Sequence, residues 1–172
     1  AVFDINKLNW MNQQYIKQLP TPALTELLLP YIQNSRYAGD WANLSADRVL
    51  VLVEAIREHL VCLGDVEQQL EVFFQPLAYE AEAWEVLQQA NVAQVLQSVH
   101  NKMPAFSDPQ EIKQFIKSVV KTTQLKPKDV FMPLRSALSG RTHGPDLPNL
   151  IYVWGREEAL ARLTETMRKL DL

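Results

Sequence analysis

Residues 130–145 contain the side chains whose types and spacing best suit binding chemistry. Two basic side chains flank a serine–glycine turn, and a glycine–proline break follows them. In chain order these residues are Arg135, Ser139, Gly140, Arg141, Thr142, Gly144 and Pro145. Such a segment presents hydrogen-bond donors and exposed backbone to an anionic partner, and it packs poorly. The pattern therefore points to a nucleic acid as the partner.

Acidic and basic residues are unevenly distributed, although the formal net charge is only −3. Between residues 40 and 85 there are ten acidic residues against two basic ones, whereas residues 102–172 contain twelve basic against eight acidic. Salt screens each charged patch beyond about 8 to 10 Å, so a cationic C-terminal surface can bind phosphate while the rest stays acidic. The alternative is an ordinary solvated helical surface with uneven charge.

Catalytic and metal-binding signatures are missing. The sequence has no glycine-rich phosphate loop, and its histidines fall on three different predicted elements: His59, His100 and His143. Cys62 has no predicted basic neighbour to activate its thiol, so we expect a small core residue. We therefore expect no catalytic residue, metal or cofactor in this chain. A small standalone enzyme that uses Cys62 remains the least favoured alternative.

Composition bounds the class of protein. The 172 residues are 47% apolar, which is too apolar for disorder, and no apolar run approaches the roughly 18 to 20 residues of a membrane span. A single cysteine excludes an internal disulfide framework. We expect a cytoplasmic protein without a membrane contact. Because the chain opens at Ala1 rather than at methionine, we also expect a fragment of a larger protein.

Hydrophobic spacing predicts an all-α fold. Asp108 and Pro109 start one helix and Glu111 supplies a capping-box partner. Ser45 caps another that ends at Gly64. Further helices are expected from residue 21, bending or ending near residue 30, on both sides of residue 91, and over the last residues. Two β-prone runs, residues 50–53 and 72–74, lie within helical patterns.

The best candidates for a boundary between domains are Pro76 and residues 103–108. We therefore expect a helical bundle of two consecutive subdomains, residues 1–76 and 77–172.

Two motifs resemble those of bacterial-type glutamyl-tRNA synthetases. Residues 3–12 and the Tyr15–Ile16 pair are similar to the segment that follows the family's Lys-Met-Ser-Lys-Ser loop. The end of the chain resembles the family's C-terminus through Phe131, Pro133, Leu134, Arg135, Ala137, Leu138, Ser139, Gly140, Pro145, Gly155, Arg156, Glu157, Arg162 and Leu163. Residues 35–120 match mainly in helical pattern.

The resemblance implies the all-helical anticodon-binding region of a class I synthetase. Residues 1–76 would hold the tail of the stem-contact module and a first anticodon-binding subdomain, and residues 77–172 a second one. The implied partner is glutamate tRNA, and the implied state is a monomer. The parent would attach glutamate to tRNA with ATP and Mg²⁺ in a catalytic domain that lies N-terminal to this chain, which would bind RNA without ligating it.

The same resemblance assigns base contacts to the C-terminal motif. Arg135 matches an arginine that contacts an anticodon base, which its planar and permanently charged guanidinium suits. Leu147 matches a leucine that packs on a base. The alternatives are a surface or helix-terminal ion pair for Arg135 and plain core packing for Leu147.

Gly144 falls where some members have a threonine that makes a polar contact. Glycine offers only its backbone there, and Arg141, Thr142 and His143 of the same turn are candidates to replace the contact.

A second implied site lies at the end of the helix that Ser45 caps. Members that reject glutamine tRNA have an arginine there, and the resemblance places His59 at this position with Arg57 two residues earlier. Losing one such contact removes roughly 1 to 3 kcal/mol of discrimination. The hypothesis is a non-discriminating synthetase that also charges glutamine tRNA, although a shift of the alignment by one turn would return Arg57 to the reading position.

A different class of function stays open as the alternative. A helical protein-interaction module without an RNA role would use tryptophans as anchors, and the candidates are Trp41, Trp84 and Trp154.

Overall fold

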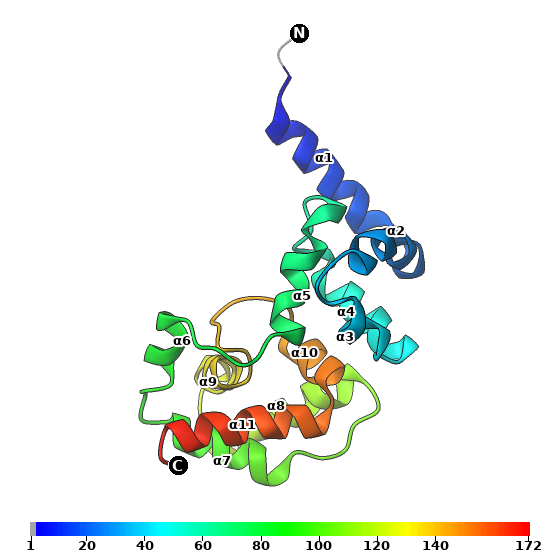
Figure 1. The fold of residues 1–172 in the computed structure, drawn as a ribbon. Helices are drawn as coiled ribbons and strands as arrows, with labels where there is room; N and C mark the ends of the chain where they lie inside the picture. The colour runs from blue at the N-terminus through cyan, green and yellow to red at the C-terminus, as the bar shows by residue number, and fades with distance from the viewer. Residues whose placement is uncertain (1–2) are drawn as a thin grey trace. The chain divides into compact units, whose positions relative to one another are not determined.

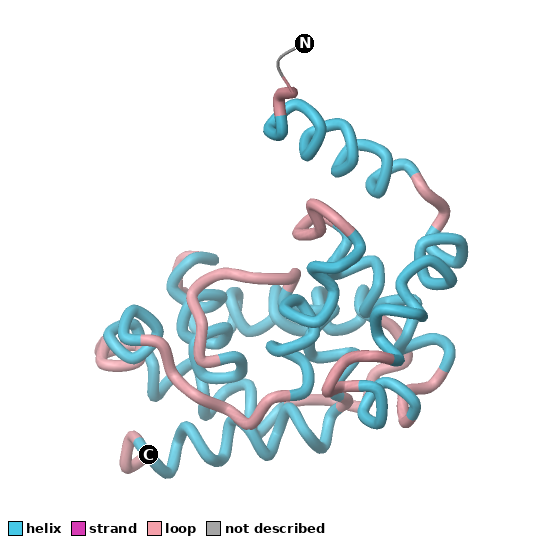
Figure 2. Tube along the Cα trace, turned by 45° about the horizontal axis from the view of Figure 1, so that its top comes forward, coloured by secondary structure: helices cyan, strands magenta, loops and turns pink. Residues whose placement is uncertain are grey.

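The computed structural model describes residues 3–172, so the first two residues of the predicted first domain lie outside it. Every regular element in the described range is helical, with eleven α-helices and one short 3₁₀ helix (Figures 1 and 2). The predicted all-α class is confirmed. The chain divides into two compact units, residues 1–75 (unit 1) and residues 76–172 (unit 2).

Unit 1 packs its helices around a small aliphatic core. Its elements are α1 (Ile5–Gln18), α2 (Thr21–Gln33), α3 (Ala38–Ala42), α4 (Ala46–Arg57), η1 (Leu63–Asp65) and α5 (Val66–Phe74). Leu28, Leu52 and Leu70 are fully buried, one each from α2, α4 and α5. The predicted cap of α4 is confirmed, because the backbone N–H of Arg48 donates to Ser45 Oγ at 3.4 Å.

Helix α2 ends at Gln33, three residues after Pro30, in agreement with the expected end near residue 30. Two other expectations for unit 1 were wrong. Helix α4 ends at Arg57, and Gly64 belongs to η1. Cys62 is exposed rather than buried, because it starts the η1 turn, where its thiol donates to Asp65 Oδ1 at 3.3 Å.

Unit 2 is a larger bundle. Its elements are α6 (Ala81–Val86), α7 (Val92–Lys102), α8 (Pro109–Thr123), α9 (Pro127–Ser139), α10 (Leu147–Trp154) and α11 (Arg156–Lys169) (Figure 1). The Asp108 carboxylate accepts from the backbone N–H of Glu111 at 2.9 Å, which confirms the predicted start of α8. The two helices expected around residue 91 are α6 and α7.

Helix α9 corrects the expectation that residues 130–145 pack poorly. Val130, Leu134 and Leu138 lie on its inner face and are completely buried. Pro133 sits inside the helix and cannot donate to the carbonyl of Asp129 four residues earlier. The side-chain amide of Asn91 donates to that carbonyl at 2.7 Å instead. A side chain from outside the helix thus supplies the missing hydrogen bond.

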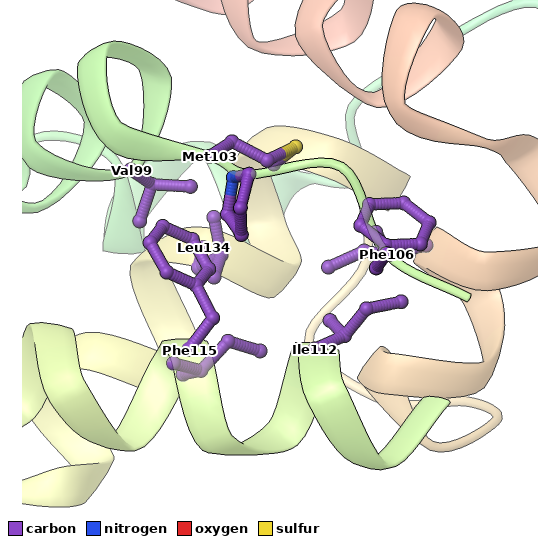
Figure 3. A pocket seen from close by; sticks show the side chains of 9 residues that line it. Val99, Met103, Phe106, Ile112, Phe115 and Leu134 are labelled. Atoms are coloured by element: carbon purple, nitrogen blue, oxygen red, sulfur yellow. The ribbon is translucent and has the colours of Figure 1, made fainter. Parts of the chain in front are cut away.

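A cavity of about 10 Å³ lies in the core of unit 2. Figure 3 shows its lining, which includes Val99, Phe106 and Phe115 and is entirely apolar. A space of about one water volume without polar partners is a packing defect rather than a ligand site. In the described part of the chain, no helix combines the length and the apolar character that crossing a bilayer requires.

Candidate nucleic-acid interface

Gly140 fixes the point at which the chain leaves α9. Its φ of +70° is in the left-handed region, and its N–H donates to the carbonyl of Ser136 at 2.9 Å. A Cβ atom at this position would lie 1.7 Å from the carbonyl oxygen of Ala78. The backbone N–H of Glu80 donates to the Gly140 carbonyl at 2.8 Å. Only glycine therefore lets residues 78–80 pass against the helix end.

Ser139 joins the helix end to the turn that follows it. Its Oγ donates to the carbonyl of Arg135 at 2.8 Å and accepts from the N–H of Arg141 at 3.2 Å. Gly144 has a φ of +128°, a backbone conformation that residues other than glycine rarely adopt. Residues 139–145 therefore form a defined turn that runs back past Arg135.

Arg135 lies half-buried beneath this turn. One Nη1 hydrogen donates to the carbonyl of Pro145 at 2.9 Å, and Nη1 lies 3.8 Å from where a Cβ of Gly144 would stand. Burial lowers the pKa of the Arg135 guanidinium, and the carboxylate of Asp146 partly opposes this effect. Of its five N–H donors, one has an acceptor within residues 3–172. A partly desolvated cation with four remaining donors favours an electron-rich ligand.

The other three residues of the predicted turn meet carboxylates. Arg141 Nε lies 3.7 Å from Glu80 Oε1, and His143 Nδ1 lies 4.0 Å from Glu80 Oε2. Thr142 Oγ1 donates to Glu82 Oε2 at 3.3 Å. The His143 side chain is nonetheless 73% exposed. These contacts attach the turn to the start of α6, so an anionic ligand would have to compete with two carboxylates here.

Leu147 is the first residue of α10 and is 1% exposed. Its side chain belongs to the core of unit 2, together with Leu134 and Leu138 of α9. Leu147 thus follows the turn of residues 139–145 closely along the chain, but its side chain exposes almost no surface to a ligand.

Arg57 and His59 of unit 1 have opposite environments. Arg57 is buried, and its Nη1 donates to the carbonyls of Lys17 at 3.1 Å and of Leu19. Its Nη2 donates to Thr21 Oγ1 at 2.6 Å and pairs with a Glu54 carboxylate oxygen at 2.8 Å.

Arg57 therefore ties the end of α1 to the start of α2. His59 follows α4 and has an exposed side chain. The two candidates are neighbours in sequence but do not share a surface.

The three tryptophans of the alternative function are buried or partly buried and make contacts within their own units. Trp41 is 9% exposed. Trp84 packs edge-on against Tyr79, with ring centroids 5.2 Å apart, and the guanidinium of Arg162 lies 4.3 Å from the Trp154 ring centroid. Side chains engaged in this way are poor anchors for a partner protein. Within residues 3–172, no cluster of three histidine, cysteine or acidic side chains is arranged for a metal.

Sequence reasoning missed the residues that hold the turn from outside. Glu80 and Glu82 lie about sixty positions from the side chains they contact, and Ala78 approaches Gly140 backbone to backbone. No local pattern pairs such distant residues. The one available signal was Gly140 directly after an apolar helix. This signal predicts a left-handed cap, but it does not predict that residues 78–80 pass against the helix end.

Comparison with known proteins gives one family match over most of the chain. The model of the anticodon binding domain family matches residues 23–167. The glutamate–tRNA ligase of Carboxydothermus hydrogenoformans is 37% identical over 167 residues, which cover 95% of this chain and 35% of that protein. The Bacillus subtilis glutamate–tRNA ligase is also 37% identical, over 169 residues with the same two coverages. The chain thus spans about a third of these relatives' length.

The fold has a solved counterpart. The crystal structure of a glutamate–tRNA ligase from Elizabethkingia meningosepticum superposes with a TM-score of 0.84, covering 99% of this chain and 33% of that one at 24% identity. At this identity the match supports the helical fold alone.

Proposed function

The chain belongs to the family of anticodon binding domains, and on that premise we propose that it binds the anticodon loop of a transfer RNA, with Arg135 as its principal base contact. The observation that carries the proposal is the state of Arg135. Its guanidinium is half-buried and oriented by the Pro145 carbonyl, with four N–H donors still available. Unstacked bases of an RNA loop offer the acceptors that such a fork recognises.

The named relatives are glutamate–tRNA ligases, so glutamate tRNA is the partner we propose. In the full-length protein, glutamate would be joined to this tRNA at the expense of ATP, in the cytoplasm. We place the binding of ATP and Mg²⁺ in the rest of the full-length protein, since the sequence of this chain has no phosphate loop. The role of this chain is to hold and orient the RNA.

The proposed division of labour follows the two units. Unit 1 would combine the tail of the stem-contact module with a first anticodon-binding subdomain, and unit 2 would be the second. The turn with Gly144, Arg141, Thr142 and His143 lies in unit 2 and would supply weaker contacts beside Arg135. We propose a monomer that binds one tRNA, which light scattering of the complex would test directly.

The environment of Arg57 favours acceptance of glutamine tRNA as well. Its Nη1 and Nη2 donors bond at the α1–α2 junction and its side chain is buried, so this arginine is poorly placed to contact a base. The exposed side chain nearby is His59, which lacks the guanidinium fork. Charging of both tRNAs by the full-length protein tests this point, and strong rejection of glutamine tRNA would refute it.

Fluorescence anisotropy with labelled glutamate tRNA at two salt concentrations tests the main proposal. Arg135→Gln should weaken binding by roughly 10- to 100-fold, as expected for loss of one bidentate base contact of about 1 to 3 kcal/mol. Arg168→Gln is the matched control, because it removes the same charge from an exposed residue of unit 2 that pairs with Glu165. Equal affinities of wild type and Arg135→Gln, with both proteins folded, would rule out the assigned role.

A further inference from the structure

Helix α8 carries a row of lysines that the proposed anticodon contact does not use. Lys113, Lys117 and Lys121, the lysine ladder, recur every fourth residue and are all exposed. Four residues of α-helix rise about 6 Å, so the three side chains form one line on a single face. The opposite side of α8 is buried through Ile112, Ile116, Val119 and Thr123. The ladder therefore faces solvent from a helix that the core holds rigid.

The ladder is not balanced by anions. No carboxylate within residues 3–172 pairs with any of its three lysines. The nearest α8 carboxylate in sequence, Glu111, accepts from the backbone N–H of Ser107 at the helix start. Like charges four residues apart destabilise a helix, whereas opposite charges stabilise it.

Helix α11 shows the usual solution. There Oε1 of Glu165 lies 3.1 Å from Nη2 of Arg168 and 3.5 Å from Nζ of Lys169. The unpaired ladder on α8 is therefore a cost to the free protein that an anionic partner would offset.

We propose that the lysine ladder binds the phosphate backbone of the same transfer RNA, as a sequence-independent contact separate from the Arg135 turn. This inference rests on the proposed function. Each lysine is followed directly by an exposed neutral side chain that can form hydrogen bonds, namely Gln114, Ser118 and Thr122, and such side chains suit phosphate and sugar oxygens. Two further lysines, Lys126 and Lys128, are exposed at the start of α9.

Other anionic partners fit this face less well. Protein interfaces have an apolar core and are depleted in lysine, yet none of the large exposed apolar side chains of the described chain lies on α8. A helix that lies on a membrane inserts its apolar face, but the apolar face of α8 is already in the core of unit 2. A polyanion that needs only charge and hydrogen bonds is the partner that remains.

The test compares the ladder variant K113Q/K117Q/K121Q with a control variant, K102Q/R168Q/K169Q, that loses the same charge elsewhere in unit 2. The affinity for glutamate tRNA is measured at salt concentrations from about 0.05 to about 0.3 M, a range in which phosphate contacts make binding strongly dependent on salt. If each lysine neutralises one phosphate, the slope of log K against log salt falls by about 2 to 3, and affinity at about 0.1 M salt falls roughly 100-fold. K113R/K117R/K121R keeps the charges and should keep the wild-type slope.

The outcomes separate the two proposals. If wild-type protein binds tRNA and the ladder variant binds it with the same slope, the ladder proposal is wrong and the Arg135 proposal stands. An equal loss in the control variant also overturns the ladder, because net charge alone would then explain the effect. If the wild type binds no tRNA, the proposed function fails and the ladder proposal fails with it. Circular dichroism of each variant verifies that the helix content and the thermal unfolding match those of the wild type.

Discussion

Replacing Gly140 with alanine should destabilise unit 2 severely. The new Cβ would lie 1.7 Å from the Ala78 carbonyl oxygen and 2.7 Å from its carbon, and neither backbone atom can rotate away. The left-handed conformation costs alanine about 1 to 2 kcal/mol, the forced displacement about 1 to 3 kcal/mol, and the lost hydrogen bond from Glu80 about 1 kcal/mol. We expect a loss of about 3 to 6 kcal/mol in the free energy of unfolding.

Equilibrium denaturation followed by tryptophan fluorescence measures this loss. Gly39→Ala is the matched control, because Gly39 lies in α3 with no atom within 4 Å of its added Cβ and should be neutral or slightly stabilised. Gly140→Asn separates the two causes, since asparagine tolerates the left-handed conformation but keeps the clash. A Gly140→Ala protein within about 1 kcal/mol of wild type would show that residues 78–80 do not constrain the helix end.

Two further predictions concern the first unit and pH. Arg57→Met should lower the free energy of unfolding by about 2 to 3 kcal/mol, mainly because the hydrogen bonds from Arg57 to backbone carbonyls are lost; the partner carboxylate of Glu54 is half-exposed and contributes less. His59→Ala should change this free energy by less than about 0.5 kcal/mol. Urea denaturation measures both values, and a larger loss for His59→Ala would contradict the structure. The hydrogen bond from Arg168 lowers the pKa of Glu165 below its ordinary value. The contribution of this carboxylate to stability is therefore present above the unfolded-state pKa and is lost as pH falls through the lower folded-state pKa. The melting temperatures of wild type and Glu165→Gln should therefore converge on acidification, and a difference that widens in acid would refute this.

The helices were predictable where one local signal was enough. Asp108 before Pro109 and Ser45 before an apolar stripe both predicted their helix starts, because a cap depends on residues within one turn. The packing of α9 was misjudged because the basic side chains and the Ser-Gly turn near its end drew attention away from its apolar inner face. The helix also contains Pro133, and the carbonyl that this proline leaves without a donor is bonded by Asn91, the residue that precedes α7; such a long-range hydrogen bond leaves no mark in local sequence.

The candidate site was predictable in composition but not in geometry. The sequence identified Arg135 and the turn after it, but the carboxylates of Glu80 and Glu82 that face this turn come from a different part of the chain. Arg57 illustrates the same limit, since its type suggested a base contact and its burial makes it a structural tie. Residue type indicates which chemistry is possible, and only tertiary packing decides which partner uses it.

The bond between Arg135 and the Pro145 carbonyl has a thermodynamic consequence for recognition. A mobile surface arginine loses side-chain conformational entropy when it binds a ligand, and this loss weakens the binding. Here that ordering is completed during folding, so in the proposed complex the guanidinium would already be oriented when the RNA binds. Association at this point should then carry a smaller entropic penalty than the same contact made by a mobile surface arginine.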